Sequence, residues 1–87
     1  MLWKYTLDFN RVVREVDEMD FDVQRKTLSE SLKSQAEALP NVDGQWLQQT
    51  MKEFATCING CEDREEIDSV LDEVYDFADS NAIWMGL

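Results

Sequence analysis

The sequence contains no histidine, and its 87 residues include no glycine-rich loop that could hold a phosphate group. Histidine is the commonest general base and a common zinc ligand, and without it no serine or cysteine nucleophile has its usual partner. Catalysis by two carboxylates alone would need a shaped pocket, for which a small helical domain has little room. We therefore predict no catalytic residue and no enzyme activity.

Basic residues are few. Eight Lys and Arg stand against 19 Asp and Glu, so the formal net charge is -11 and the pI is about 4.1. Nucleic acid and anionic membrane surfaces should repel such a chain, and we expect it to bind neither directly. Its expected partner is a basic protein. Acidity that serves solubility alone is the competing interpretation.

Long hydrophobic runs are also missing. The longest uninterrupted one is Ala82-Ile83-Trp84-Met85, far too short to cross a membrane, and residues 1–9 do not resemble a secretory signal. These absences predict a cytoplasmic protein. Cys57 and Cys61 are too few for a disulfide scaffold and too few for a structural zinc site. We expect one buried and one partly exposed free thiol, with a labile redox pair as the alternative, and we predict no metal and no cofactor.

One proline and three glycines leave long stretches free to form regular structure. Apolar residues recur at spacings of three and four, which is typical of one buried helical face. The pattern predicts a single mainly α domain over residues 1–87, built as a small bundle of four helices. These span residues 11–19, a second stretch ending before Pro40, a third ending at Asn59-Gly60, and a fourth from Asp63 to Ser80-Asn81.

The first residues fit two patterns. Residues 2–19 have helical spacing, but the strict alternation over residues 3–9 is typical of a half-buried strand. Aromatic enrichment favours the strand, which would pair with the apolar tail 82–86. Trp3 and Trp84 would then meet, because chain termini often lie close together. We expect the tail to cover the core, and an exposed anchor or dimer contact is the alternative.

Helix ends can be assigned from capping residues. The second helix begins at an N-cap Asp22 or at a capping box over residues 27–30, and Asp43 is the expected cap of the third. Gly60 is expected to end the third helix in the left-handed conformation. Asp63 and Glu66 form a capping-box-like pair at the start of the fourth. The apolar stripe of the third helix includes Trp46, Leu47, Met51, Phe54 and Ile58.

Acidic residues are concentrated at the end of the chain. Residues 61–87 contain nine acids and one base, Arg64, whereas residues 23–60 are neutral. Six of the acids step by three or four and should form one stripe along the fourth helix. Their carboxylates would recur about every 5 Å, a spacing that could imitate part of a phosphate backbone. The predicted partner-binding residues are Glu62, Glu65, Asp68, Asp72, Glu73, Asp76, Asp79 and Trp84.

A secondary acidic cluster comprises Asp17, Glu18, Asp20 and Asp22. Its spacing does not match the calcium-binding loop of an EF-hand, and the glycine that such a loop requires is absent. We interpret it as an exposed junction between two helices, with weak, non-specific binding of cations by its carboxylates as the alternative.

These observations predict an acidic, non-catalytic inhibitor that masks the nucleic-acid-binding surface of a basic protein. Phage-encoded anti-defence proteins, including anti-CRISPR and anti-restriction proteins, and bacteriocin immunity proteins share this general profile. No motif of any such family is matched, and the likeness is one of class alone. The alternative is a small assembly chaperone or adaptor that binds through its apolar aromatic tail, as a monomer or a homodimer.

Overall fold

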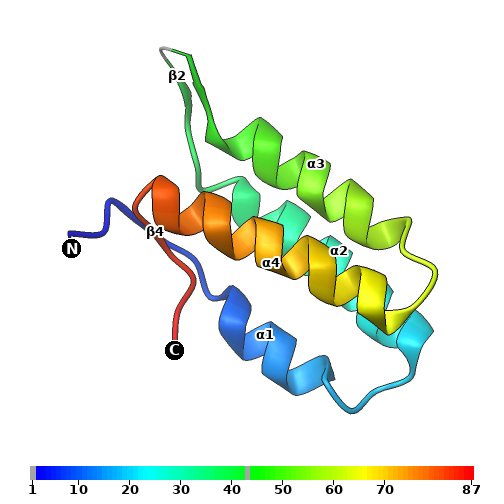
Figure 1. Ribbon diagram of the computed structural model, residues 1–87. Coiled ribbons are helices and arrows are strands. Elements are labelled where there is room, and N and C mark those ends of the chain that lie inside the picture. The colour runs from blue at the N-terminus through cyan, green and yellow to red at the C-terminus, as the bar shows by residue number, and fades with distance from the viewer. Residues whose placement is uncertain (1, 43) are drawn as a thin grey trace.

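The computed structural model describes residues 2–42 and 44–87. Helix α2 packs against both α1 and α3, and α4 lies in front of α2 in the view of Figure 1. The mainly helical, bundle-like fold is therefore confirmed. Within the described residues the helices are α1 (Phe9–Val16), α2 (Phe21–Ala36), α3 (Leu47–Asn59) and α4 (Arg64–Ser80). The strands are β1 (Tyr5–Thr6), β2 (Asn41–Val42), β3 (Gln45–Trp46) and β4 (Ile83–Trp84).

The core forms where the apolar faces of all four helices meet. Each helix contributes a row of buried side chains at helical spacing, as the sequence pattern predicts. The largest side chains with almost no exposure are Phe9, Leu28, Leu32, Met51, Ile58, Ile67, Ile83 and Val74. None of the helices in the described residues is both long and apolar enough to cross a membrane.

The two ends of the chain pair as predicted. Strand β1 runs parallel to β4, with Tyr5 opposite Ile83 and Thr6 opposite Trp84. The strand is shorter than the range 3–9, because Phe9 already lies in α1 and is fully buried there. The turn between α4 and β4 places Ala82 at φ 57°, and its carbonyl oxygen accepts a hydrogen bond from the Lys4 backbone N–H at 2.7 Å. This bond and the Leu7 N–H to Trp84 oxygen bond extend the pairing at both ends.

The start of α2 differs from both assignments made from the sequence. The helix begins at Phe21, so Asp22 lies in its first turn and residues 27–30 lie inside it. Asp20 occupies the N-cap position, but its side chain makes no capping hydrogen bond. The earlier start is explained by packing, because half-buried Phe21 contacts the core and the buried Gln24 side chain accepts a hydrogen bond from Arg64 at 2.8 Å.

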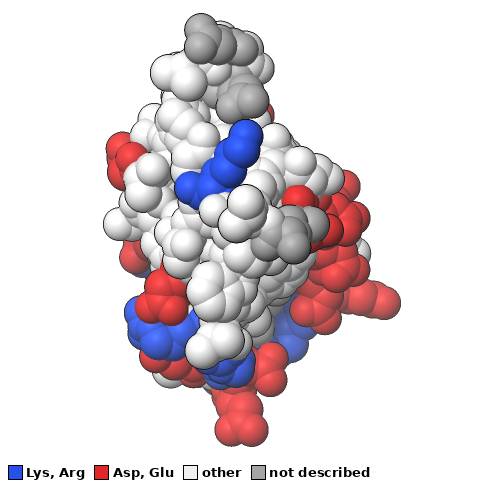
Figure 2. Space-filling model, turned by 90° about the vertical axis from the view of Figure 1, so that its left-hand side faces the viewer, with Lys and Arg blue, Asp and Glu red and all other residues white. Residues whose placement is uncertain are grey.

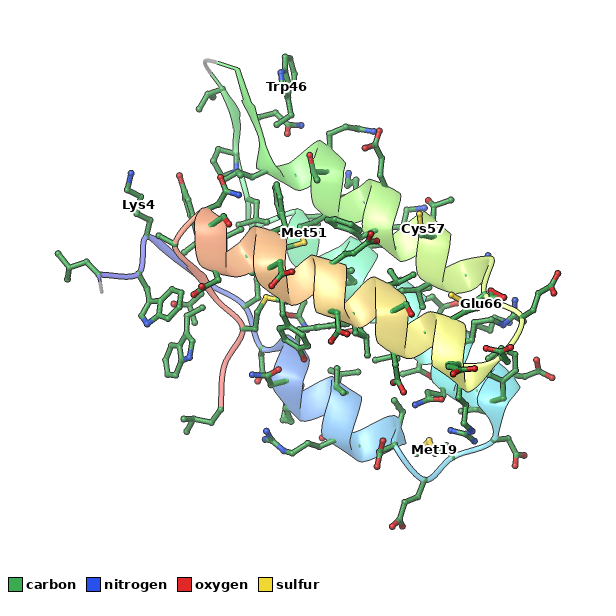
Figure 3. The ribbon with its side chains drawn as sticks, viewed as in Figure 1. Lys4, Met19, Trp46, Met51, Cys57 and Glu66 are labelled. Atoms are coloured by element: carbon green, nitrogen blue, oxygen red, sulfur yellow. The ribbon has the colours of Figure 1, made fainter. Side chains whose placement is uncertain are left out.

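The start of α3 and the conformation of Gly60 also need correction, whereas the predicted end of the helix at Asn59-Gly60 is confirmed. The helix begins at Leu47, three residues later than an Asp43 cap implies, and Asp43 itself lies outside the described residues. Trp46 is 60% exposed and projects from the hairpin of β2 and β3, so it is not part of the buried stripe (Figure 3). Gly60 ends α3 with φ -90°, a right-handed conformation, because its N–H still bonds back to the Thr56 and Cys57 carbonyls.

Candidate protein-binding surface

Helix α4 has two faces of opposite character. Its buried face packs into the core through Ile67, Leu71, Val74 and Ala78. Steps of three and four residues place five acids, Glu65 and the four aspartates that follow it in the helix, on the roughly opposite face. All five are exposed. In Figure 2, Asp and Glu side chains gather along one edge of the molecule, and further acids are scattered over the rest of the face shown. We call these five acids the acidic stripe: Glu65, Asp68, Asp72, Asp76 and Asp79.

The start of α4 explains the place of the remaining predicted acids. The Asp63 carboxylate accepts a hydrogen bond from the Glu66 N–H at 2.9 Å, and the Glu66 carboxylate accepts one from the Glu62 N–H at 3.1 Å. This confirms the predicted cap and fixes Glu62 at the end of the stripe, where it is exposed. Glu73 is also exposed, but its position on the helix places it on the flank of the stripe.

The acidic stripe has no internal counter-charge. Four ion pairs are present in the described part of the chain, and none includes an acid of α4. Arg64, the only base of this segment, donates instead to the Gln24 side chain at 2.8 Å and to the Met19 carbonyl at 2.5 Å. Its charge is thus directed toward α2 and the loop before it. The stripe is therefore a one-signed surface with its carboxylates available to a partner.

The secondary acidic cluster lies at the same end of the molecule as the start of α4. Asp17 and Asp20 stand at the end of α1 and the start of α2, and all four members of the cluster are exposed. The Arg64 bond to Met19 ties this loop to the start of α4. Asp22 has a long ion pair with Arg25 at 3.6 Å. The cluster thus extends the negative surface beyond the first turn of α4.

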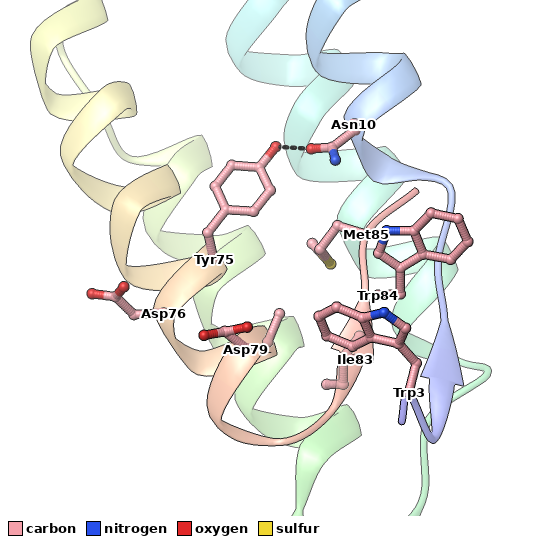
Figure 4. Close-up of a pocket in the computed structure, with 9 residues that line it drawn as sticks. Trp3, Asn10, Tyr75, Asp76, Asp79, Ile83, Trp84 and Met85 are labelled. Atoms are coloured by element: carbon pink, nitrogen blue, oxygen red, sulfur yellow. Dashed lines mark hydrogen bonds between the residues drawn. The ribbon is translucent and has the colours of Figure 1, made fainter. Parts of the chain in front are cut away.

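A pocket of about 330 Å³ lies at the opposite end of α4. Figure 4 shows Trp3 and Trp84 beside each other on one side, with Asp76 and Asp79 of α4 on the other. The meeting of the two tryptophans, predicted from the sequence, is confirmed. In the tail, Ile83 and Met85 are buried and cover the core, whereas Trp84 is 37% exposed. The tail thus covers the core and also presents an aromatic surface.

Tyr75 and Asn10 hold the inner wall of this pocket, and sequence analysis missed both. The Tyr75 hydroxyl donates to the Asn10 side-chain oxygen, and the Asn10 amide donates to the Gly86 carbonyl at 2.8 Å. Burial raises the pKa of Tyr75, and nearby Arg14 opposes the rise only in part, so the hydroxyl is a neutral donor at pH 7. No spacing rule marks Tyr75, because it lies beside the buried row of α4 and contacts a residue far away in sequence.

The cysteines and carboxylates show no metal-binding arrangement. Among residues 2–42 and 44–87, no three Cys, Asp or Glu side chains gather closely enough to hold a metal ion. Cys57, on α3 (Figure 3), is exposed and Cys61 is buried, in line with the prediction of one partly exposed and one buried free thiol. Burial raises the pKa of the Cys61 thiol, and the negative charges of Glu66 and Asp63 add to the rise. Cys61 is therefore a packing residue with little thiolate character.

Comparison with known proteins gives no relative. No known protein family, curated protein or solved structure matches the chain.

Proposed function

We propose that the protein is a non-catalytic inhibitor that binds a basic, nucleic-acid-binding partner through α4 and masks the surface on which that partner holds nucleic acid. The observation that carries this proposal is the exposed, one-signed acidic stripe without an ion pair in the described residues. A groove rich in Lys and Arg would supply the counter-charges that the fold does not supply.

The dimensions of α4 suit this role. A helix of 17 residues is roughly 25 Å long, and carboxylates at three- and four-residue steps recur about every 5 Å along it. Double-stranded DNA also presents a closely spaced row of negative charge. A partner that neutralises phosphates with Lys and Arg could therefore accept this helix in place of part of its nucleic acid. Such binding would be fast and strongly weakened by salt.

The alternative proposal is an assembly adaptor that binds through apolar area. It is favoured by exposed apolar side chains around the paired chain ends, where Leu2 is 90% exposed and Leu87 is 89% exposed, beside Trp3 and Trp84. Apolar burial is not screened by salt, so binding of this kind should persist at high ionic strength.

The experiment compares two variants with equal changes in net charge. One reverses Asp68 and Asp72 on the acidic stripe to Lys, and its matched control reverses Glu30 and Glu53, which are exposed on α2 and α3. Neither control residue has an ion pair in the described part of the chain. Tagged wild type and both variants are used to capture proteins from a lysate along a salt gradient. Any captured protein is then tested for displacement by double-stranded DNA and by RNA.

We expect one basic nucleic-acid-binding protein to elute at moderate salt. The stripe variant should lose it, the control variant should retain it, and nucleic acid should compete for it. Equal loss in both variants would mean that net charge alone causes binding, and the inhibitor proposal would be wrong. A partner that is insensitive to salt and to nucleic acid would support the adaptor instead.

A further inference from the structure

The pocket at the end of α4 combines aromatic rings and carboxylates from segments far apart in the sequence. Trp3 precedes β1, Trp84 lies in β4, and Tyr75, Asp76 and Asp79 lie in the last turns of α4. Trp3 and Trp84 remain 41% and 37% exposed, so part of each side chain is accessible to a ligand. The hydrogen bonds of Tyr75 and Asn10 fix the inner wall.

The two sides of the pocket suit different parts of one ligand. The tryptophans form an aromatic side, and the end of α4 opposite them carries Asp79 and Asp76, of which the Asp76 carboxylate points away from the rings (Figure 4). Indole faces carry a negative quadrupole and attract a cation that lies over them. The carboxylates add formal negative charge. An anion would be repelled by both sides, and a purely apolar group would strip water from carboxylates without offering them a partner.

Arg14, the cation closest to the inner wall of the pocket, already has another contact, and Lys4 follows Trp3 without lining the pocket. Arg14, which lies close enough to Tyr75 to affect its pKa, donates a hydrogen bond to the Leu87 backbone oxygen. In the described residues the carboxylates of Asp76 and Asp79 have neither an ion pair nor a hydrogen bond. The charge of these two carboxylates is therefore not matched by an ion pair within the described residues and is available to a cation of a partner.

We propose that this pocket receives an arginine side chain of the partner protein, with the guanidinium against the Trp3 and Trp84 rings and attracted by the negative charge of Asp79 and Asp76 at the end of α4. A guanidinium is planar, weakly hydrated and able to stack on aromatic faces while its edge bonds to carboxylates. A lysine ammonium is more strongly hydrated and cannot stack in this way. The proposal rests on the proposed function, to which it adds an anchoring residue at one end of the acidic stripe.

The test uses the tryptophans themselves as probes. The three indole N–H resonances of the ¹⁵N-labelled protein come from Trp3, Trp84 and Trp46, which lies outside the pocket. They are assigned with single Trp to Phe variants. The probe is the capped tripeptide acetyl-Gly-Arg-Gly-amide. Its comparators carry citrulline, a neutral isostere of arginine, or lysine at the central position.

We expect the arginine peptide to shift the Trp3 and Trp84 resonances in a saturable way and to leave Trp46 unmoved. The citrulline peptide should bind at least about tenfold more weakly, because it lacks the charge. Asp76→Asn with Asp79→Asn should weaken the arginine peptide by about fivefold or more. Trp84→Phe should weaken it as well, whereas the matched Trp46→Phe variant should not.

Several results would overturn the proposal. These are equal shifts at all three indoles, equal binding of citrulline or lysine, and full binding by the double Asn variant. The same double variant keeps Asp68 and Asp72, so it separates this inference from the proposed function. If the pocket does not bind the arginine peptide but capture of the partner still depends on Asp68 and Asp72, only the arginine proposal is wrong. If the pocket binds the arginine peptide but the protein captures no basic partner, the inhibitor proposal is wrong and the arginine-binding property of the pocket stands.

Discussion

Helices α1 and α4 both carry many charged side chains, yet they arrange them differently. In α1, Arg11 bonds to Glu15 at 2.7 Å and to Asp8, the N-cap residue before the helix, at 2.6 Å. Charges of opposite sign are therefore paired within this short segment. Lys52 and Glu37 balance each other in the same way between α3 and the end of α2. In α4 the acids recur without a single ion pair in the described residues.

The difference shows what each surface contributes to the fold. Mixed charges stabilise a helix locally by small amounts, whereas like charges at the same spacings repel. Repulsion between the acids of the stripe therefore lowers the free energy of unfolding. Burial of the apolar face of α4 must offset this loss. A surface that opposes folding is a candidate for selection by something other than folding, which is the basis of the proposed function.

The largest expected effect is on stability, and it tests whether the buried face of α4 packs as tightly as the buried face of α2. Ile67→Ala and its counterpart Leu32→Ala in α2 each remove a side chain with no exposed area. Both should lower the free energy of unfolding by about 2–4 kcal/mol, measured by urea titration. A much smaller loss for Ile67→Ala would show that α4 packs loosely. Helix α4 would then differ from the other helices in its buried face as well as in its exposed charges.

A smaller effect is expected at the helix starts. Asp63→Ala removes the carboxylate that caps α4 and should cost about 1 kcal/mol of unfolding free energy. Asp20→Ala is the matched control, because Asp20 holds the same position in α2 without a capping bond. Its loss should be clearly smaller. Equal losses would mean that negative charge at the start of a helix, and not the hydrogen bond, gives the stabilisation.

Stability at high pH gives the next comparison. Burial raises the pKa of Tyr75 above the value of 10.0 expected in the unfolded chain. The folded state thus binds this proton more tightly, so the contribution is complete below the unfolded pKa and is lost as the pH rises through the folded pKa. Between about pH 8 and pH 11, wild type should lose more stability than Tyr75→Phe. An equal loss in urea titrations would show that the pocket wall opens easily.

The smallest effects should differ in sign. Asp72→Asn removes repulsion within the acidic stripe and should stabilise by about 0.2–0.5 kcal/mol. Glu37→Gln breaks the 2.9 Å pair with Lys52 and should destabilise by about as much. Thermal unfolding at low and high salt measures both, and salt should reduce both differences. If the two variants shift the midpoint in the same direction, the distinction between the two surfaces is lost.

Much of the fold follows from local patterns in the sequence. Helical spacing identified the four helices and their buried rows, and the Asp63 cap was correctly placed because capping involves residues three apart. The start of α2 was missed because packing of Phe21 and Gln24 against distant residues extends the helix backward. Trp46 was misplaced because a large apolar residue at helical spacing need not be buried when it stands in a hairpin.

The candidate site was only partly predictable. Exposure of the acidic stripe follows from the opposite position of the buried row, and the meeting of Trp3 with Trp84 follows from the pairing of the chain ends. The pocket itself depends on Tyr75 and Asn10, whose hydrogen bond joins α4 to α1 across 65 positions of sequence. Local spacing carries no information about such a contact.

The parallel pairing of β1 with β4 has a consequence for timing. Trp3 is synthesised 81 residues before Trp84, and it cannot complete its side of the pocket until Trp84 has been synthesised and released. The acidic end of α4 also reaches its place opposite the aromatic rings only when both ends of the chain have closed. Long-range closure of this kind is a slow step in folding. The pocket is therefore the last part of the domain to form during synthesis, and the first to disappear when either end of the chain detaches.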